Sequence, residues 1–152
     1  MDQAAGSTKL KRLEPLVGEW SVDATFQGAP PTGPLGRTVF EWMPGEQFLI
    51  QRWEVPDPGP DGIAIIGLDP EGDGYLQHYF DARGVARVYA MTFREGVWEL
   101  SRTSPDFSPL DFSQRFAGTF SEEGNTIHGR WEICHDGSTW EHDIELTYVR
   151  VR

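Results

Sequence analysis

Short runs in which apolar and polar residues alternate recur along almost the whole chain, and each run ends at glycine, proline or another turn-forming residue. This pattern is typical of antiparallel β-strands that place one face in a core and are joined by tight turns. The runs lie near residues 18–27, 36–43, 47–55, 62–69, 74–81, 85–93, 97–103, 112–120, 126–134 and 139–151. About ten strands is within the range of closed up-and-down barrels.

The length of 152 residues is enough for one domain with a sizeable core. The Pro- and Gly-rich stretches at 28–36 and 56–62 are too short for interdomain linkers and are interpreted as loops. A short helix is expected from about Ser7, a candidate N-cap, to Leu16, although Pro15 is unfavourable in a helix interior. We therefore predict an all-β fold, a single closed antiparallel barrel over 1–152 in which the N-terminal segment 1–17 caps one end.

Charge and cysteine content narrow the partners and the compartment. The chain has 13 Lys and Arg against 24 Asp and Glu, a net charge of -11, so it repels phosphate backbones and anionic headgroups. Neither nucleic acid nor a membrane surface is expected as a partner. Cys134 is the single cysteine, and neither a signal-peptide run before Leu16 nor an apolar span of about 20 residues is present. A cytoplasmic protein is expected, and the sequence leaves monomer and homodimer open.

The C-terminal hairpin carries the clearest register information. Asp-Gly at 136–137 predicts a two-residue turn, which places His142 opposite Trp131 on the inner face. The same register sets Glu132 against Glu141, a like-charge pair that it does not explain. A shift of two residues would separate these acids without exchanging the faces.

Turns at 95–96 and 123–125 extend the inner face backwards along the chain. They place Phe93 beside Trp98, Tyr89 beside Arg102, and Gln114 among inward residues. For the turn at 82–84, the favoured register places His78 opposite Arg87 on the inner face. The sequence leaves open which faces of 74–81 and 85–93 point inward.

The start of the first strand, Gly18-Glu19-Trp20, resembles the Gly-x-Trp signature of the calycin superfamily of lipocalins, fatty-acid-binding proteins and nitrobindins. In those families an Arg or Lys of the last strand packs across the Trp ring, and Arg150 has the inward parity for this contact, which stabilises by about 0.5–2 kcal/mol. The whole pattern looks like a family of small bacterial calycin-like proteins of unknown function. The resemblance implies a barrel closed by Trp20 and Arg150, and no activity.

A barrel of about ten strands is wider than side chains usually fill, so we expect a cavity that holds a ligand or ordered water. Convergent polar groups among aromatic rings are typical of a small-molecule site. The predicted ligand-binding residues are His78, Arg87, Tyr89, Trp98, Arg102, Gln114, Trp131, His142 and Tyr148. The main hypothesis is a binding protein for a small amphipathic or anionic molecule, with aromatic side chains around its apolar body and the inward arginines at its polar end.

The histidines suggest one alternative and argue against another. Nitrobindins attach haem through a His on the last strand, so the resemblance allows a haem-binding barrel that uses His142. No other cofactor is implied. His128, Cys134 and His135 lie in the same hairpin, but the predicted register spreads them over different faces, so we expect no metal site.

Catalytic motifs are missing from the sequence: it has no nucleophile elbow, phosphate loop or dinucleotide fingerprint. We therefore assign no catalytic residue. A third hypothesis is a small lyase or isomerase acting in the same cavity, with an acid–base pair such as His78 and Tyr89.

Overall fold

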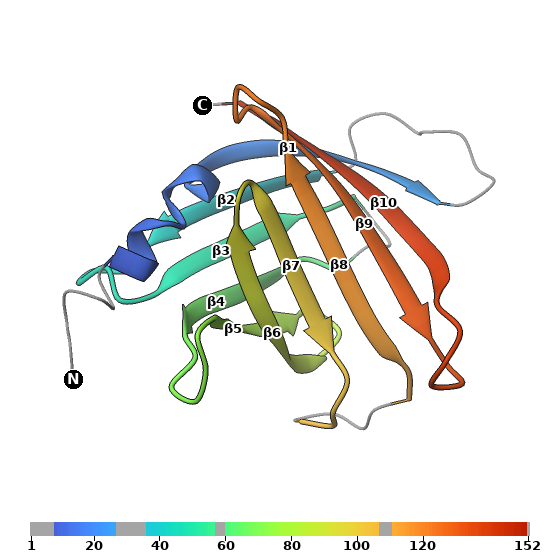
Figure 1. Cartoon of the computed structure of the whole chain (residues 1–152). Coiled ribbons are helices and arrows are strands. Elements are labelled where there is room, and N and C mark those ends of the chain that lie inside the picture. Colours follow the sequence, from blue (N-terminus) through green and yellow to red (C-terminus); the bar gives the residue numbers. More distant parts are fainter. Residues whose placement is uncertain (1–7, 27–35, 57–59, 107–110, 152) are drawn as a thin grey trace.

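The computed structural model describes residues 8–26, 36–56, 60–106 and 111–151, which form a closed antiparallel β-barrel (Figure 1). Each strand pairs with the next in sequence, and the last pairs with the first. The prediction of an all-β up-and-down barrel is therefore confirmed. The strands are β1 (Gly18–Phe26), β2 (Gly36–Trp42), β3 (Leu49–Glu54), β4 (Gly62–Leu68), β5 (Tyr75–Asp81), β6 (Ala86–Arg94), β7 (Val97–Arg102), β8 (Ser113–Phe120), β9 (Thr126–Cys134) and β10 (Glu141–Arg150).

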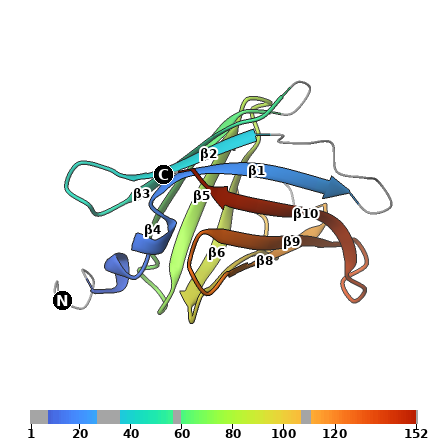
Figure 2. The same ribbon diagram turned by 90° about the horizontal axis from the view of Figure 1, so that it is seen from above.

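A short N-terminal segment covers one end of the barrel, which we call the helical end (Figures 1 and 2). Residues 8–11 form one helical turn, and a 3₁₀ turn, η1 (Glu14–Leu16), follows where Pro15 prevents a continuous α-helix. Leu10, Leu13 and Leu16 are buried against the barrel interior. We call the opposite end the far end. None of the helices in the described residues is long and apolar enough to cross a membrane.

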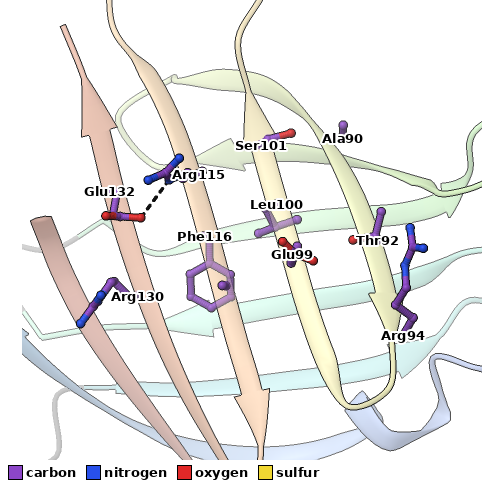
Figure 3. A pocket seen from close by; sticks show the side chains of 11 residues that line it. Ala90, Thr92, Arg94, Glu99, Leu100, Ser101, Arg115, Phe116, Arg130 and Glu132 are labelled. Carbon is purple, nitrogen blue, oxygen red and sulfur yellow. Dashed lines mark hydrogen bonds and ion pairs between the residues drawn. The ribbon is translucent and has the colours of Figure 1, made fainter. Parts of the chain in front are cut away.

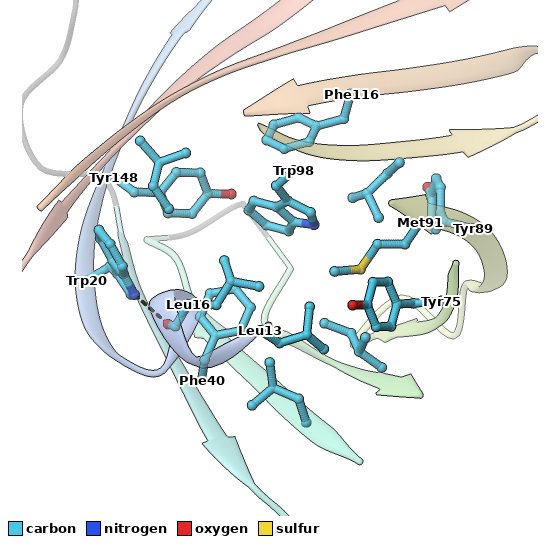
Figure 4. Close-up of a cluster of buried hydrophobic side chains, with 14 residues drawn as sticks. Leu13, Leu16, Trp20, Phe40, Tyr75, Tyr89, Met91, Trp98, Phe116 and Tyr148 are labelled. Carbon is cyan, nitrogen blue, oxygen red and sulfur yellow. Dashed lines mark hydrogen bonds between the residues drawn. The ribbon is translucent and has the colours of Figure 1, made fainter. Parts of the chain in front are cut away.

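The apolar core fills the barrel next to the helical end. Figure 4 shows Leu13 and Leu16 facing the rings of Trp98 and Tyr148. These side chains come from β7, β10 and the N-terminal segment, so the core joins the two ends of the chain. Further members of this buried cluster are Trp20, Phe40, Leu49, Ile66, Tyr75, Met91, Leu100 and Ile127.

Gly129 lets the ring of Phe116 pack closely against β9. A Cβ atom at Gly129 would lie 2.5 Å from the ring of Phe116, which is closer than real Cβ contacts allow. A side chain at this position would displace Phe116 and, with it, its ring contact with Trp98 (centroids 4.9 Å apart).

The register of the last hairpin differs from the predicted one. The carboxylate of Asp136 accepts backbone hydrogen bonds from Ser138 (2.9 Å) and Thr139 (2.7 Å), which stabilises a loop over 135–140 instead of a two-residue turn. A β-bulge then follows, so Trp131 pairs with Ile144, and His142 pairs with Glu132. The prediction that His142 faces Trp131 inside the barrel was wrong.

The β5–β6 hairpin is also shifted by one residue. The turn after Asp81 pairs Phe80 with Ala86 and not with Val85, because the Asp81 amide bonds to the Val85 carbonyl. One residue of shift exchanges the faces of β5. His78 therefore pairs with Val88 on the outer face, and Gln77 takes the inward place. The predicted registers of β6 with β7, including Phe93 opposite Trp98, are confirmed.

Candidate functional site

Inward-facing polar side chains gather between the apolar core and the far end. Alternation along β6 places Arg87 and Tyr89 on the inner face, and β7 and β8 add Arg102 and Gln114. Aromatic side chains border these groups. We call the whole set the far-end cluster; it comprises Trp53, Gln77, Tyr79, Arg87, Tyr89, Arg102, Gln114 and Trp131.

Arg102 already has a carboxylate partner. Its side chain is 2% exposed, and its Nε and NH2 groups donate to the two oxygens of Asp106 at 2.9 and 3.0 Å. The backbone amide of Val88 donates to the same carboxylate at 2.7 Å. The sequence hypothesis assumed that Arg102 needs an anionic ligand. The structure shows that Asp106 already supplies the anion. Because Asp106 lies in a loop beyond β7, strand alternation gave no signal of its position.

Tyr89, Arg87 and Gln114 form one hydrogen-bonded group. The side-chain oxygen of Gln114 accepts from the Tyr89 hydroxyl at 2.9 Å and from Arg87 NH1 at 3.3 Å. Burial raises the pKa of Tyr89, so its hydroxyl stays protonated and acts as a donor near neutral pH. The Nε atom of Arg87 is buried and has no hydrogen-bond partner among the described residues.

Aromatic rings form a continuous series beside these polar groups. Trp53 stacks on Tyr79 with centroids 5.3 Å apart, and Tyr79 contacts Tyr89 at 6.1 Å. Tyr89 then contacts Trp131 at 5.6 Å, and Trp131 contacts Phe116 of the core at 5.1 Å. This series gives the far end an apolar wall suited to a flat or hydrophobic ligand body.

Asp81 lies next to Tyr79, a member of the aromatic wall. Asp81, with a fully buried side chain, accepts from the Tyr79 hydroxyl at 2.6 Å and pairs with Arg83 at 2.7 Å. Burial alone would raise the pKa of Asp81, but the hydrogen bonds from Arg83 and Tyr79 outweigh it and lower the pKa to about 2. The charge of Asp81 is therefore compensated within the barrel, and the cluster keeps Arg87 as its cation without a carboxylate partner among the described residues.

The structure brings together five of the predicted ligand-binding residues and separates the other four. Arg87, Tyr89, Arg102, Gln114 and Trp131 belong to the far-end cluster. Trp98 and Tyr148 pack against each other in the apolar core, with ring centroids 5.9 Å apart. His78 and His142 lie on the outer face by register.

Both alternative functions, the haem-binding barrel and the lyase or isomerase, depended on a histidine inside the barrel. The structure places both of these histidines on the outer face. Tyr89 faces inward and His78 outward, so the proposed acid–base pair does not form. The register of His142 directs it away from the barrel interior, where the haem hypothesis required it. No three His, Cys, Asp or Glu side chains of the described chain are grouped so that they could hold a metal ion.

Sequence reasoning missed Gln77, Tyr79 and Trp53. Gln77 and Tyr79 follow from the one-residue shift of β5, since they have the opposite parity to His78. Trp53 was within a predicted strand, and its alternation with Gln51 was a usable signal that it faces inward.

The structure contains the predicted contact between Trp20 and Arg150. The two residues pair in register, and the guanidinium carbon lies 4.2 Å from the centroid of the indole ring. Arg150 also donates to the carbonyls of Val17 (2.8 Å), Pro15 (2.7 Å) and Gly124 (3.3 Å). The indole nitrogen of Trp20 donates to the Leu16 carbonyl at 2.9 Å.

A hollow of about 630 Å³ lies on the outer face of β6–β9 (Figure 3). Two arginines of its lining have carboxylate partners, because Arg115 pairs with Glu132 at 2.8 Å and Arg130 with Glu145 at 3.7 Å. Arg115 also lies 4.0 Å from the centroid of Trp140. These ion pairs are partly exposed to solvent, where such pairs contribute little to stability. The far-end cluster is the better candidate site, because it contains a buried donor without a partner among the described residues.

The fold is similar to that of a solved protein. The crystal structure of Rv2717c from M. tuberculosis matches with a TM-score of 0.61 and 16% identity, over 95% of this chain and 98% of that chain. At this identity the likeness shows the fold alone. Neither a family model nor a curated protein matches the sequence. The closed barrel and the structural likeness agree with the fold that the Gly-x-Trp resemblance implied.

Proposed function

We propose that the protein binds a small amphipathic or anionic molecule at the far end of its barrel. The aromatic wall supports this proposal, because Tyr79, Tyr89 and Trp131 offer a continuous apolar surface to a ligand body. A barrel fold is compatible with an internal ligand site. No motif in the sequence and no described pair of side chains supports catalysis more specifically.

The observation that carries the proposal is the state of Arg87. Its Nε donor is buried without a partner in the described part of the chain, and its NH1 has one long bond to Gln114, at 3.3 Å. Arg87 as a whole is only partly buried, but a donor nitrogen removed from water is costly unless an acceptor compensates it. An anionic ligand group would supply these acceptors, and arginine is well suited to bind carboxylates and sulfonates through paired hydrogen bonds.

The overall charge of -11 opposes the approach of an anion from a distance. Affinity therefore depends on local contacts with Arg87 and the aromatic wall, and a modest, micromolar affinity is expected. Added salt should screen the long-range repulsion and leave these short contacts in place.

The test uses anilinonaphthalene sulfonate, which combines an anionic group with an aromatic body. We expect the wild-type protein to bind it with enhanced fluorescence and to melt at a higher temperature when it is present. Arg87→Met should weaken binding at least about tenfold, because it removes a charge-assisted hydrogen bond. The stability of the ligand-free protein should change little.

Arg94→Met is the matched control. Arg94 is on the same strand as Arg87, and its side chain is exposed and belongs to the outer hollow. The substitution removes the same charge without touching the far-end cluster, so it should leave probe binding unchanged. Equal affinity of wild type and Arg87→Met would show that the site is wrongly placed, and absence of probe binding to wild type would refute the proposed function.

We also infer a calycin-like protein that works in the cytoplasm, without nucleic acid or membrane partners. The Trp20–Arg150 contact supports the calycin part of this inference. Its cytoplasmic part is supported by the single cysteine and the acidic charge.

A further inference from the structure

Gln77 and Arg87 lie on the two sides of Tyr89 on the inner face of β5 and β6. Gln77 pairs directly with Tyr89, and Tyr79 pairs with Arg87, so Gln77 and Arg87 are diagonal neighbours. Gln77 is 4% exposed, and its Oε1 atom is buried without a hydrogen-bond partner in the described ranges. Within the described residues, the inner face thus carries an unpartnered acceptor diagonally across from the unpartnered Nε donor of Arg87.

The neighbouring side chains do not supply what Gln77 lacks. The Tyr89 hydroxyl donates to Gln114 at 2.9 Å, and the Tyr79 hydroxyl donates to Asp81 at 2.6 Å. Leaving a buried amide oxygen unpaired is unfavourable, and such atoms usually have a ligand or water partner. A bare carboxylate could accept from Arg87, but it has no hydrogen to donate to the Gln77 oxygen.

A ligand that satisfies both atoms needs an anionic acceptor and a hydroxyl donor close together. An α-hydroxy carboxylate has this arrangement, because its hydroxyl is on the carbon next to the carboxylate. We propose that the Gln77–Arg87 pair selects α-hydroxy acids with an aromatic or apolar body, with the carboxylate on Arg87 and the hydroxyl donating to Gln77. This inference rests on the proposed function and adds the ligand class to it.

The experiment compares three acids that share a phenyl body. Phenyllactate carries the α-hydroxyl, hydrocinnamate lacks it, and the O-methyl ether of phenyllactate keeps the oxygen without the hydrogen. Isothermal titration of wild-type protein should show phenyllactate binding about tenfold more tightly than the other two, the effect expected of one buried hydrogen bond. Because the comparison is made on the wild-type protein, it does not depend on any variant folding.

Gln77→Met should remove the preference and bring phenyllactate to the affinity of hydrocinnamate. Gln51→Met is the matched control, because Gln51 is also an inward, buried amide, but its Nε2 already donates to Thr38 at 3.3 Å. That variant should keep the tenfold ratio. Arg87→Met should weaken all three acids together.

The outcomes separate this inference from the function on which it rests. If the naphthalene sulfonate probe binds through Arg87 but the three acids bind equally, or none of them binds, the α-hydroxy selectivity is overturned and the proposed function stands. Retention of the ratio in Gln77→Met would also overturn it. If the probe fails to bind as well, both proposals fall.

Discussion

Each end of the barrel contains an arginine and a tryptophan, but the two arginines differ in how fully their hydrogen-bond donors are satisfied. At the helical end, Arg150 stacks on Trp20 and donates to three backbone carbonyls. At the far end, Arg87 has one long bond to Gln114 and a buried nitrogen with no partner in the described residues. Trp20 is fully buried, whereas Trp131 is partly exposed.

Under the proposed function, this difference separates a structural arginine from a ligand-binding one within the same fold. A guanidinium whose NH1 and NH2 groups donate to fixed carbonyls while it stacks on an indole is held as part of the packing at that end. One that remains undersatisfied among aromatic rings lowers its free energy by binding an anion. The contrast predicts large stability losses at the helical end and selective binding losses at the far end.

The largest effect is expected for Trp20→Ala. The substitution removes a fully buried indole and its stack with Arg150, and should lower the free energy of unfolding by about 3–5 kcal/mol. Arg150→Ala should cost less. A double-mutant cycle, measured by denaturant unfolding, should give a coupling of about 0.5–2 kcal/mol between the two residues.

Trp131→Ala is the comparison at the other end and should cost less than Trp20→Ala, because Trp131 is only partly buried. Equal losses would show that both ends are packed alike and would break the contrast. A coupling of zero between Trp20 and Arg150 would mean that the stack does not close the barrel.

Arg102→Met is expected to have the next largest effect. It removes the cation and the two hydrogen bonds that Arg102 gives to the Asp106 carboxylate, whose side chain is 12% exposed. Breaking a buried pair from one side should cost about 3 kcal/mol in thermal or denaturant unfolding. Arg87→Met, on the neighbouring strand, should cost much less, because it removes a 3.3 Å hydrogen bond to Gln114 and a 5.8 Å contact with the Phe112 ring but no carboxylate pair of the described residues.

Asp106→Asn combined with Arg102→Met should recover part of that loss, since the uncompensated carboxylate is then removed. If Arg102→Met alone left the free energy of unfolding unchanged, the ion pair would contribute nothing to the stability of the protein. Arg102 would then be as available for a ligand as Arg87.

The sequence predicted the barrel well because its evidence was redundant. Ten alternating runs and the Gly18/Trp20 signature with Arg150 at the other end of the chain all indicated the same architecture, so errors of a residue or two in strand bounds did not matter. The pairing of β6 with β7 and the inner faces of β7 and β8 were predicted correctly, whereas the sequence left the inner face of β6 open.

The site was predicted less well because each face depends on a single turn. The loop held by the Asp136 carboxylate and the bulge after His142 change the register of β10 against β9. The turn after Asp81 changes the register of β5 against β6. A one-residue change in a turn moves a whole strand face, which exchanged His78 for Gln77. The partner of Arg102 comes from a loop, for which alternation makes no prediction.

The smallest of the stability effects is a pH dependence confined to the far end. Asp81 has a pKa of about 2 in the folded protein, below its ordinary value of 3.8, so the folded state binds fewer protons there than the unfolded state does. Its contribution, about 2 kcal/mol, is therefore complete above about pH 4 and is lost as the pH falls towards 2. The Trp20–Arg150 closure contains no carboxyl group and should not take part.

Denaturant unfolding of wild type and Asp81→Asn between pH 2 and 7 isolates this contribution. The variant should be less stable at neutral pH, and the difference should shrink as the pH falls through the pKa of Asp81. The difference between the two proteins is needed, because backbone hydrogen bonds from Thr139 and Ser138 also hold the pKa of Asp136 well below its usual range. Glu99→Gln, an exposed acid on the outer face, is the control and should reproduce the wild-type profile. A stability difference between wild type and Asp81→Asn that stays constant over the whole range would show that the Asp81 carboxylate is not selectively stabilised, and that the far end is as insensitive to pH as the helical end.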